Sequence, residues 1–376
     1  MANLTDYLKW RGDLTFEASP FTEIDALVLC QISYLHFDGL LSKDSFTESV
    51  SLGTLYKKFT SAEDYERRID VGLLINKKTV EVLKLASESV RFKDVSVTGY
   101  VSILDSEKEE QFTAFTYKIT NKLNYVCYRG TDDTLVGWKE DFNLAIEEQV
   151  PAQQDAKKYL EDAMKALKGD FTVGGHSKGG NLAIFASAMS NPKNLKRIKY
   201  IYNFDGPGFT KKRIKSQEFY QIIPLIRSYY PQLSIVGMLF EHAGEYRVVE
   251  SDPAGIMSHD PFKWHILGRE FVTLENFDKE TVVISDSLNT WMNQLKPEQT
   301  AIFVDTLFKI IKSTGAKTNT EFEENKWLNS IKIANAIRKL DPELRKIMEA
   351  VVKDLFKAIT DNVSWVKNRQ SKKQGV

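Results

Sequence analysis

Short apolar runs and helical patterns alternate along the middle of the chain, and this alternation constrains the fold more than any other feature. An apolar run at 123–128 is followed by a helical pattern at 152–168, a run at 171–174, a helical pattern at 179–189 and a run at 199–204. Strands separated by helices form βαβ units, whose strands lie parallel between covering helices. The sequence therefore predicts an α/β protein with a mostly parallel central sheet.

The segments on either side have other patterns. Apolar residues between Ile24 and Leu35 recur every three or four positions after a possible cap at Thr22, and further helices are expected at 64–75 and 79–89. From 95 to 119 the apolar period is two, which predicts a hairpin before the strand at 123–128. Two more strands are expected at 233–240 and 246–249.

Amphipathic helical patterns return after about residue 270. The clearest apolar stripe comprises Val351, Val352, Leu355, Phe356 and Ile359, and the last residues, 368–376, are polar and basic. We expect this stripe to pack on the protein itself. The pattern divides the chain into a helical N-terminal segment (1–90), an α/β core (91–270) and a helical C-terminal extension (271–376).

The overall charge excludes one class of partner. Lys and Arg number 51, and so do Asp and Glu, so the whole molecule offers no strong electrostatic field to attract nucleic acid.

No run has the length of a membrane span, and the acidic, polar N-terminus does not resemble a secretion signal. Cys30 and Cys127 lie in apolar stretches without metal-ligand spacing, so buried reduced thiols are expected. We therefore expect a cytoplasmic protein that uses no metal or cofactor; its oligomeric state is not predicted.

A serine lies between glycines where a strand pattern passes into a helix pattern. The pentapeptide Gly175-His176-Ser177-Lys178-Gly179 matches G-x-S-x-G and follows the run Phe171 to Val173. In α/β-hydrolases this motif is a sharp turn that exposes a nucleophilic serine, and glycines are needed because a Cβ would collide with the neighbouring strand and helix. The pattern predicts an α/β-hydrolase fold with Ser177 as nucleophile.

Acyl transfer also needs donors for the negative oxygen of the transition state. The amide of Lys178 follows the nucleophile and supplies one. The strand at 123–128 runs into Arg129-Gly130-Thr131, where Gly130 permits a tight turn. Thr131 is the second candidate for this oxyanion hole.

Three motifs together resemble a known family. They are Tyr-Arg-Gly-Thr-Asp-Asp at 128–133, Gly-Trp-Lys-Glu-Asp-Phe at 137–142 and Gly-Gly-His-Ser-Lys-Gly-Gly at 174–180. Their order and spacing are similar to the fungal-type class 3 lipases, and the match is closest to a bacterial lipase-like family of unknown function, Mbeg1-like, over about residues 5–270. The resemblance implies an ester hydrolase, with Ser177 as nucleophile and Thr131 in the oxyanion hole.

The catalytic histidine of this class follows the nucleophile in the chain. His176 is part of the turn itself and is expected to pack beneath it. The candidates after it are His242, His259 and His265. His259 is preferred because it lies in a polar loop after the last strand pattern, and His265 is the alternative.

The acid is less clearly marked. Class 3 lipases carry it after a strand that corresponds here to the neighbourhood of Ser234, so the sequence departs from their pattern. Asp205 stands one strand earlier, at a strand's carboxyl end, where open α/β sheets gather functional groups. Asp205 is therefore preferred, and Asp252 is the alternative.

The sequence thus predicts a Ser177-His259-Asp205 triad acting on an ester of a small molecule or a lipid. A thioesterase or an amidase would use the same residues. A fold that binds a ligand or a protein without turnover is the alternative, and the missing aspartate at Ser234 is its main support. The Lys178 side chain is expected either in solvent or as a cation at the mouth of the site that favours anionic substrates.

Overall fold

A computed structural model describes residues 1–72, 75–132, 134–144, 148–234, 236–252 and 258–294, and then 302, 305–306, 308–310, 314–315, 326–342 and 344–346. The C-terminal stripe predicted at Val351 to Ile359 and the tail at 368–376 lie outside these residues.

A nine-stranded sheet runs through the described part of the chain, in the order β1-β2-β3-β4-β5-β6-β7-β8-β11. Strands β4 to β8 are parallel, whereas β1 to β4 and the β8-β11 pair are antiparallel. The predicted hairpin and parallel sheet are therefore confirmed. The strands are β1 (Val50–Ser51), β2 (Ser96–Asp105), β3 (Glu110–Lys118), β4 (Leu123–Tyr128), β5 (Asp170–His176), β6 (Ile198–Phe204), β7 (Ile226–Pro231), β8 (Glu245–Val249) and β11 (Thr273–Leu274), with a separate hairpin of β9 (Ile266–Leu267) and β10 (Glu270–Phe271).

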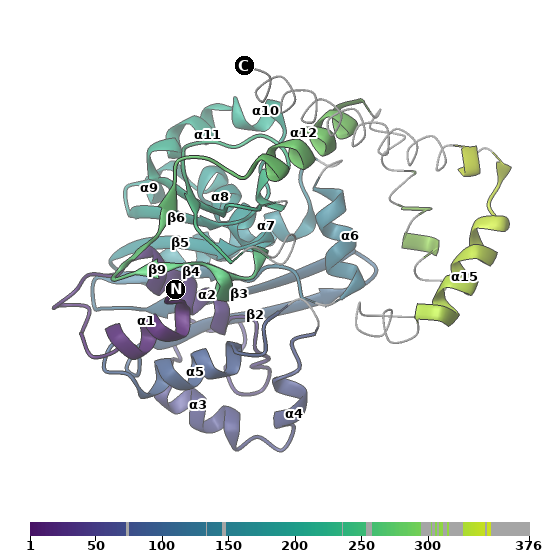
Figure 1. Ribbon diagram of the computed structural model, residues 1–376. Helices are drawn as coiled ribbons and strands as arrows, with labels where there is room; N and C mark the ends of the chain where they lie inside the picture. Colours follow the sequence, from purple (N-terminus) through teal and green to yellow (C-terminus); the bar gives the residue numbers. More distant parts are fainter. Residues whose placement is uncertain are drawn as a thin grey trace.

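Helices cover both faces of the sheet (Figure 1). One face packs against the N-terminal helices α1 (Leu4–Arg11), α2 (Glu23–Ile32), α3 (Leu52–Thr60), α4 (Tyr65–Arg68) and α5 (Thr79–Glu88). The other packs against α7 (Pro151–Ala166), α8 (Lys178–Met189) and α11 (Gln217–Ile222). The remaining helices are α6 (Leu135–Asn143), α9 (Pro192–Leu195), α10 (Lys211–Ile214), α12 (Lys279–Gln294), α15 (Lys326–Arg338) and the 3₁₀ turns η1 (Ile223–Leu225), η2 (Val236–Met238) and η4 (Pro261–Lys263).

The alternation of side chains along β4 shows why helices cover both faces of the sheet. Tyr125 and Cys127 are buried in the core beneath the N-terminal helices, whereas Val126 and Tyr128 are buried in the core beneath α7 and α8. Successive strand side chains point to opposite faces, so a strand that is apolar throughout needs a layer on each side. Cys30 and Cys127 are both free and buried, as predicted.

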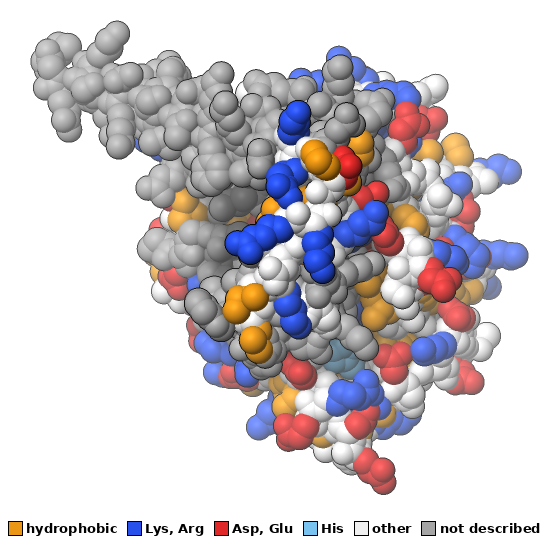
Figure 2. All heavy atoms as spheres, turned by 90° about the vertical axis from the view of Figure 1, so that its right-hand side faces the viewer, with side chains coloured by type: hydrophobic (Ala, Val, Ile, Leu, Met, Phe, Trp, Pro, Cys, Tyr) orange, Lys and Arg blue, Asp and Glu red, His pale blue; other side chains and the backbone are white. Residues whose placement is uncertain are grey.

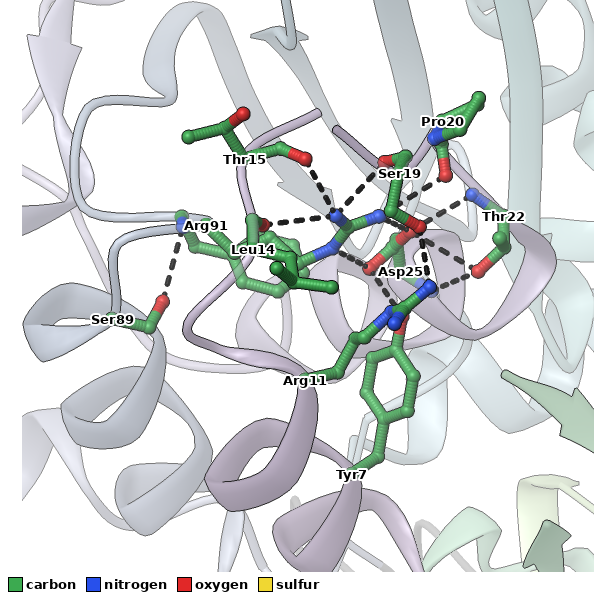
Figure 3. Close-up of polar contacts among 11 residues, drawn as sticks. Tyr7, Arg11, Leu14, Thr15, Ser19, Pro20, Thr22, Asp25, Ser89 and Arg91 are labelled. Atoms are coloured by element: carbon green, nitrogen blue, oxygen red, sulfur yellow. Dashed lines mark hydrogen bonds and ion pairs between the residues drawn. The ribbon is translucent and has the colours of Figure 1, made fainter. Parts of the chain in front are cut away.

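A buried ion pair holds the N-terminal segment together (Figure 3). The Arg91 guanidinium lies 2.5 Å from the Asp25 carboxylate of α2 and donates to the backbone carbonyls of Leu14, Ser19 and Pro20. Both side chains of the pair have no exposed surface. Because the guanidinium is satisfied by a carboxylate and by carbonyls, its charge is tolerated in the core.

Two predicted elements are wrong. The segment predicted as a strand at 233–240 instead contains η2, and the strand that the sequence analysis missed is β7. Gly237 packs so closely that a Cβ there would meet the Asp205 carboxylate, which requires a compact turn. The helix predicted at 64–75 is helical only as α4, and Gly72, with φ +74°, lies beyond its end in a conformation that helices do not contain.

The described part of the C-terminal extension is basic on one side. Figure 2 views the molecule from the side on which α15 lies and shows Lys and Arg side chains gathered there. Lys332, Arg338 and Lys339 are exposed in this region.

None of the helices in the described part of the chain has both the length and the apolar character of a membrane span. A location in the cytoplasm stays a prediction.

Candidate active site

Ser177 occupies the turn between β5 and α8. Its backbone has φ 58° and ψ −134°, a conformation that residues other than glycine rarely adopt. A Cβ at Gly175 would collide with the backbone of Gly179, and a Cβ at Gly179 would collide with the Tyr128 carbonyl, so both glycines are needed. Ser177 is partly exposed although the residues on either side of it are buried. The turn thus has the strained, exposed geometry of a nucleophile elbow.

Asp205 and His259 are joined by a hydrogen bond. Asp205 directly follows β6 and is fully buried, and its Oδ2 lies 2.5 Å from His259 Nδ1. Because a carboxylate only accepts, Nδ1 carries the proton and Nε2 is left to act as a base. The Asp205 backbone has φ 52°, and its amide donates to the Tyr229 carbonyl at 2.9 Å. The acid is therefore fixed by β6 and β7 together.

This pair lies beside the serine turn. The Ser177 amide donates to the carbonyl of Phe204, the last residue of β6, at 2.8 Å. A Cβ on Gly206 would lie 2.5 Å from the Ser177 carbonyl oxygen. The ring centroids of His176 and His259 are 4.5 Å apart. The structure thus brings all three predicted triad residues to one edge of the sheet.

The loop that carries His259 is anchored on both sides. The buried Trp264 indole donates to the Ser258 carbonyl at 2.9 Å, and Asn76 donates to the Asp260 carboxylate at 2.8 Å. The other Asp260 oxygen accepts the Phe262 amide at 3.0 Å and so caps η4. His259 therefore stands between two fixed neighbours.

His176 lies beneath the turn, as expected, and links the N-terminal segment to His259. Its Nε2 lies 3.0 Å from the His259 carbonyl and its Nδ1 lies 3.0 Å from the Tyr34 hydroxyl. Burial lowers the pKa of His176 well below its ordinary value, so the ring is neutral. Nε2 then donates to the carbonyl and Nδ1 accepts from Tyr34. Tyr34 was not predicted as a site residue, because in the sequence it is only one position within the helical pattern from Ile24 to Leu35.

Ser234 supplies the second partner of the acid. Its hydroxyl donates to Asp205 Oδ1, and Ser234 is itself fully buried. With His259 on Oδ2, both carboxylate oxygens of Asp205 are hydrogen-bonded. The residue found where the lipase pattern expects an acid is therefore a donor to an acid on the neighbouring strand.

The alternative candidates pair with each other. His265 Nε2 lies 2.8 Å from Asp252 Oδ1, and the Asp252 side chain is 65% exposed. The hydrogen bond to His265 lowers the pKa of Asp252. His242 Nδ1 lies 2.7 Å from the Tyr230 hydroxyl, and burial lowers the pKa of His242 to about 4. These contacts account for both alternative histidines without Ser177.

The loop that carries Thr131 lies against the turn. A Cβ at Gly130 would lie 2.9 Å from the Ser177 Cβ, so the loop can approach the serine only with glycine there. The Thr131 hydroxyl donates to Asp141 Oδ2 of α6 at 2.6 Å. Because that hydroxyl is already engaged, the Thr131 amide is the group left for an oxyanion. Lys178 is the first residue of α8, and the backbone amide of a first helical residue has no acceptor within its own helix. The Lys178 amide is therefore the other candidate donor to an oxyanion.

Asp141 is a site residue that the sequence analysis did not single out. Burial raises the pKa of its carboxyl to about 6, against the opposing effects of Lys178 and of the bond from Thr131. The sequence feature that could have indicated Asp141 is its position in the 137–142 motif, ten residues after Thr131.

The Lys178 side chain corrects the sequence analysis. It is neither in solvent nor at the mouth of the site, because Lys178 is only 1% exposed. Its Nζ lies 2.8 Å from Glu140 Oε2 and 2.9 Å from the Gln111 carbonyl. These partners are 38 and 67 residues away, so the local pattern did not reveal them.

A separate pocket of about 290 Å³ lies among residues from the first half of β6 and from β7, β8 and the start of α2, including Tyr200, Arg227, Arg247 and Glu23. It is not formed by the residues around Ser177. Among the described residues no His, Cys, Asp or Glu cluster is arranged to hold a metal ion.

The sheet order, the covering helices and the serine turn define a lipase-like α/β-hydrolase fold. The chain belongs to the Mbeg1-like family, whose model matches residues 86–309, more than half of the chain. Comparison with proteins of curated function finds no match.

Three solved lipases are similar over part of the chain. A fungal lipase in complex with an inhibitor has 14% identity and a TM-score of 0.33, over 45% of this chain and 69% of that one. The Rhizomucor miehei lipase–propeptide complex has 16% identity and a TM-score of 0.34, over 55% and 75%. M37 lipase has 14% identity and a TM-score of 0.34, over 58% and 70%. At this level of similarity, function has to be inferred from the residues of the site.

Proposed function

We propose that this protein is a serine hydrolase that cleaves acyl esters of small molecules or lipids through an acyl-enzyme. The observation that carries the proposal is the Asp205–His259 hydrogen bond beside the strained turn at Ser177. A nucleophile, a base on its orienting acid and two amides near one point are the set that acyl transfer requires.

In the proposed reaction the Ser177 hydroxyl attacks the ester carbonyl carbon while His259 Nε2 takes its proton. The amides of Thr131 and Lys178 stabilise the negative oxygen of the tetrahedral intermediate. The intermediate collapses to an acyl-enzyme, and His259 returns the proton to the leaving alcohol. Water, deprotonated by His259, then attacks the acyl group and releases the carboxylic acid with Ser177 restored.

Asp205 keeps His259 in the tautomer that this cycle needs and stabilises the cation formed after each proton transfer. Its own position depends on groups from two strands, the Tyr229 carbonyl and the Ser234 hydroxyl. The departure from the lipase pattern at Ser234 is thus compatible with catalysis. That departure was the main support for a scaffold without turnover.

Fluorophosphonate labelling tests the proposal. A fluorophosphonate reacts only with an activated serine, so the native protein is expected to be labelled at Ser177, and Ser177→Ala and His259→Gln are expected to remain unlabelled. His265→Gln is the matched control and should label like the native protein. Failure of the native, folded protein to label would favour the scaffold.

A panel of p-nitrophenyl esters of graded chain length, with a thioester and an anilide, then defines the substrate class. Turnover of the esters at least tenfold faster than turnover of the thioester and the anilide is expected. A reversed order would change the proposal to a thioesterase or an amidase with the same residues.

A further inference from the structure

A buried ion pair lies directly behind the proposed oxyanion hole. The side chains of Lys178 and Glu140 are 1% and 0% exposed, and their charged atoms are 2.8 Å apart. Lys178 is the first residue after the nucleophile, and Glu140 directly precedes Asp141, the partner of Thr131. The pair therefore joins the serine turn to helix α6, whose Asp141 accepts from the Thr131 hydroxyl.

The Glu140 carboxylate also organises the backbone around it. Its Oε2 accepts from the Gln111 amide at 3.1 Å, and its Oε1 accepts from the Ala152 amide at 3.0 Å. Lys178 donates to the carbonyl of the same Gln111. Strand β3, helix α6, the start of α7 and the serine turn thus meet at one pair of charges.

The Gln111 side chain extends this network to the loop of Thr131. The Gln111 Oε1 accepts from the Asp132 amide at 3.4 Å, and a Cβ on Gly137 would collide with this same oxygen. The Thr131 hydroxyl is held from the other side by Asp141. The Thr131 loop is thus held in part by Gln111, which contacts both Lys178 and Glu140, and in part by Asp141, which follows Glu140 in the chain.

We propose that Lys178 is a positioning residue whose ion pair with Glu140 holds the Thr131 loop at a fixed distance from Ser177, so that both oxyanion donors are in place before substrate binds. This inference rests on the proposed hydrolase function. Oxyanion donors contribute most when they need no rearrangement during the reaction. A buried ion pair adds little net stability compared with a well-packed apolar pair, so its use here is geometric.

The test replaces both charges at once with the Lys178→Met, Glu140→Gln double variant. Both replacements are close in size, and neither partner is left as an unpaired buried charge. We expect kcat to fall roughly 10-fold to 100-fold, because small displacements of a catalytic group have effects of this size. KM should stay within about threefold, since the donors act on the transition state.

The matched control is the Asp25→Asn, Arg91→Met double variant, which removes an equally buried ion pair from the N-terminal segment. It should lower the melting temperature and leave kcat within about twofold. A second, milder variant is Glu140→Asp, which keeps both charges but shortens the reach to Lys178. It should lower kcat about threefold or more, and it decides the question if the double variant does not fold.

A pH profile separates positioning from a structural role. Asp141 is faced by Lys178, Glu140, Thr131 and His259. The Lys178 charge lowers the pKa of Asp141, and the Glu140 charge raises it by a smaller amount. Loss of both charges in the double variant should therefore raise the pKa of Asp141 and move the acid limb of the kcat/KM profile to higher pH. The shift should be absent when the same variant also carries Asp141→Asn.

Hydrogen exchange of the α6 amides gives a readout that does not depend on turnover. Faster exchange is expected in the Lys178→Met, Glu140→Gln variant and unchanged exchange in the Asp25→Asn, Arg91→Met variant. A folded variant with native kcat and native exchange overturns the inference. If the native protein turns over no ester, the proposed function falls, and the exchange result alone decides whether the pair fixes this loop.

Discussion

The Ser234 hydroxyl donates a hydrogen bond to the Asp205 carboxylate across the carboxyl ends of β7 and β6. The carboxylate thus lies one strand earlier than the class 3 lipase pattern expects, and a hydroxyl stands at the expected position. The Asp–His pair has the same geometry at the imidazole in either case, because only the carboxylate oxygen facing Nδ1 matters for its tautomer.

Asp205→Asn should lower kcat on the order of 10⁴-fold, because an amide can hold the imidazole in the wrong tautomer. Turnover of a p-nitrophenyl ester measures the effect. Asp252→Asn removes the other Asp–His pair and should leave kcat within about threefold. The assignment of the acid is wrong if the two variants show the opposite order.

Ser234→Ala should lower both stability and kcat. It leaves Asp205 Oδ1 buried without its donor, which costs about 1–3 kcal/mol in the free energy of unfolding. We expect a fall in kcat of roughly tenfold, because the carboxylate is then held by His259 alone. Urea unfolding and ester turnover measure the two effects. Native values for both would show that the hydroxyl is not needed.

Asp141→Asn should stabilise the protein at neutral pH. The pKa of Asp141 is raised from 3.8 to about 6 in the folded state, so the folded state binds its proton more tightly than the unfolded state does. Stability therefore falls as the pH rises from about 4 to about 6, by roughly 2–3 kcal/mol.

Unfolding free energies of the native protein and Asp141→Asn should thus agree near pH 4 and diverge up to about pH 7, with the variant more stable. A difference that does not change with pH would contradict this reasoning. The same variant should have a lower kcat, because Thr131 loses a charged partner.

Tyr34→Phe should impair catalysis from outside the α/β core. It removes the donor to His176 Nδ1, whose other nitrogen holds the His259 carbonyl. We expect kcat to fall roughly threefold to tenfold, with fluorophosphonate labelling slowed but not abolished. Tyr117→Phe is the control, because Tyr117 is also a buried tyrosine that donates to a distant partner, the Leu29 carbonyl of α2. Equal loss of kcat in both variants would indicate a general packing effect.

Local patterns were sufficient to predict most strands of the sheet and the turn at Ser177. The apolar run at 171–174, two glycines and the helical face from Leu182 onward are contiguous, so neighbouring residues determine this geometry. The elements predicted wrongly depend on distant partners. The segment predicted as a strand at 233–240 lies beyond the end of β7 at Pro231. Its turn η2 is fixed by the close approach of Gly237 to Asp205.

The same distinction applies to the site. The triad candidates were predicted from positions after strands, which follow a general rule of open α/β sheets. Lys178 looked exposed because nothing in the neighbouring sequence indicates Glu140 or Gln111. Tyr34 and His176 are 142 residues apart, and their contact is a product of tertiary packing alone.

The Tyr34–His176 hydrogen bond limits how this chain can be shortened. The family model begins at residue 86, so a recombinant fragment cut to 86–309 would omit α2, Asp25 and Tyr34. Such a fragment would expose a sheet face that carries Phe115, Tyr117 and Tyr125, and His176 would lose the hydroxyl beneath it. We therefore expect that the boundary of the family match at residue 86 is not a folding boundary.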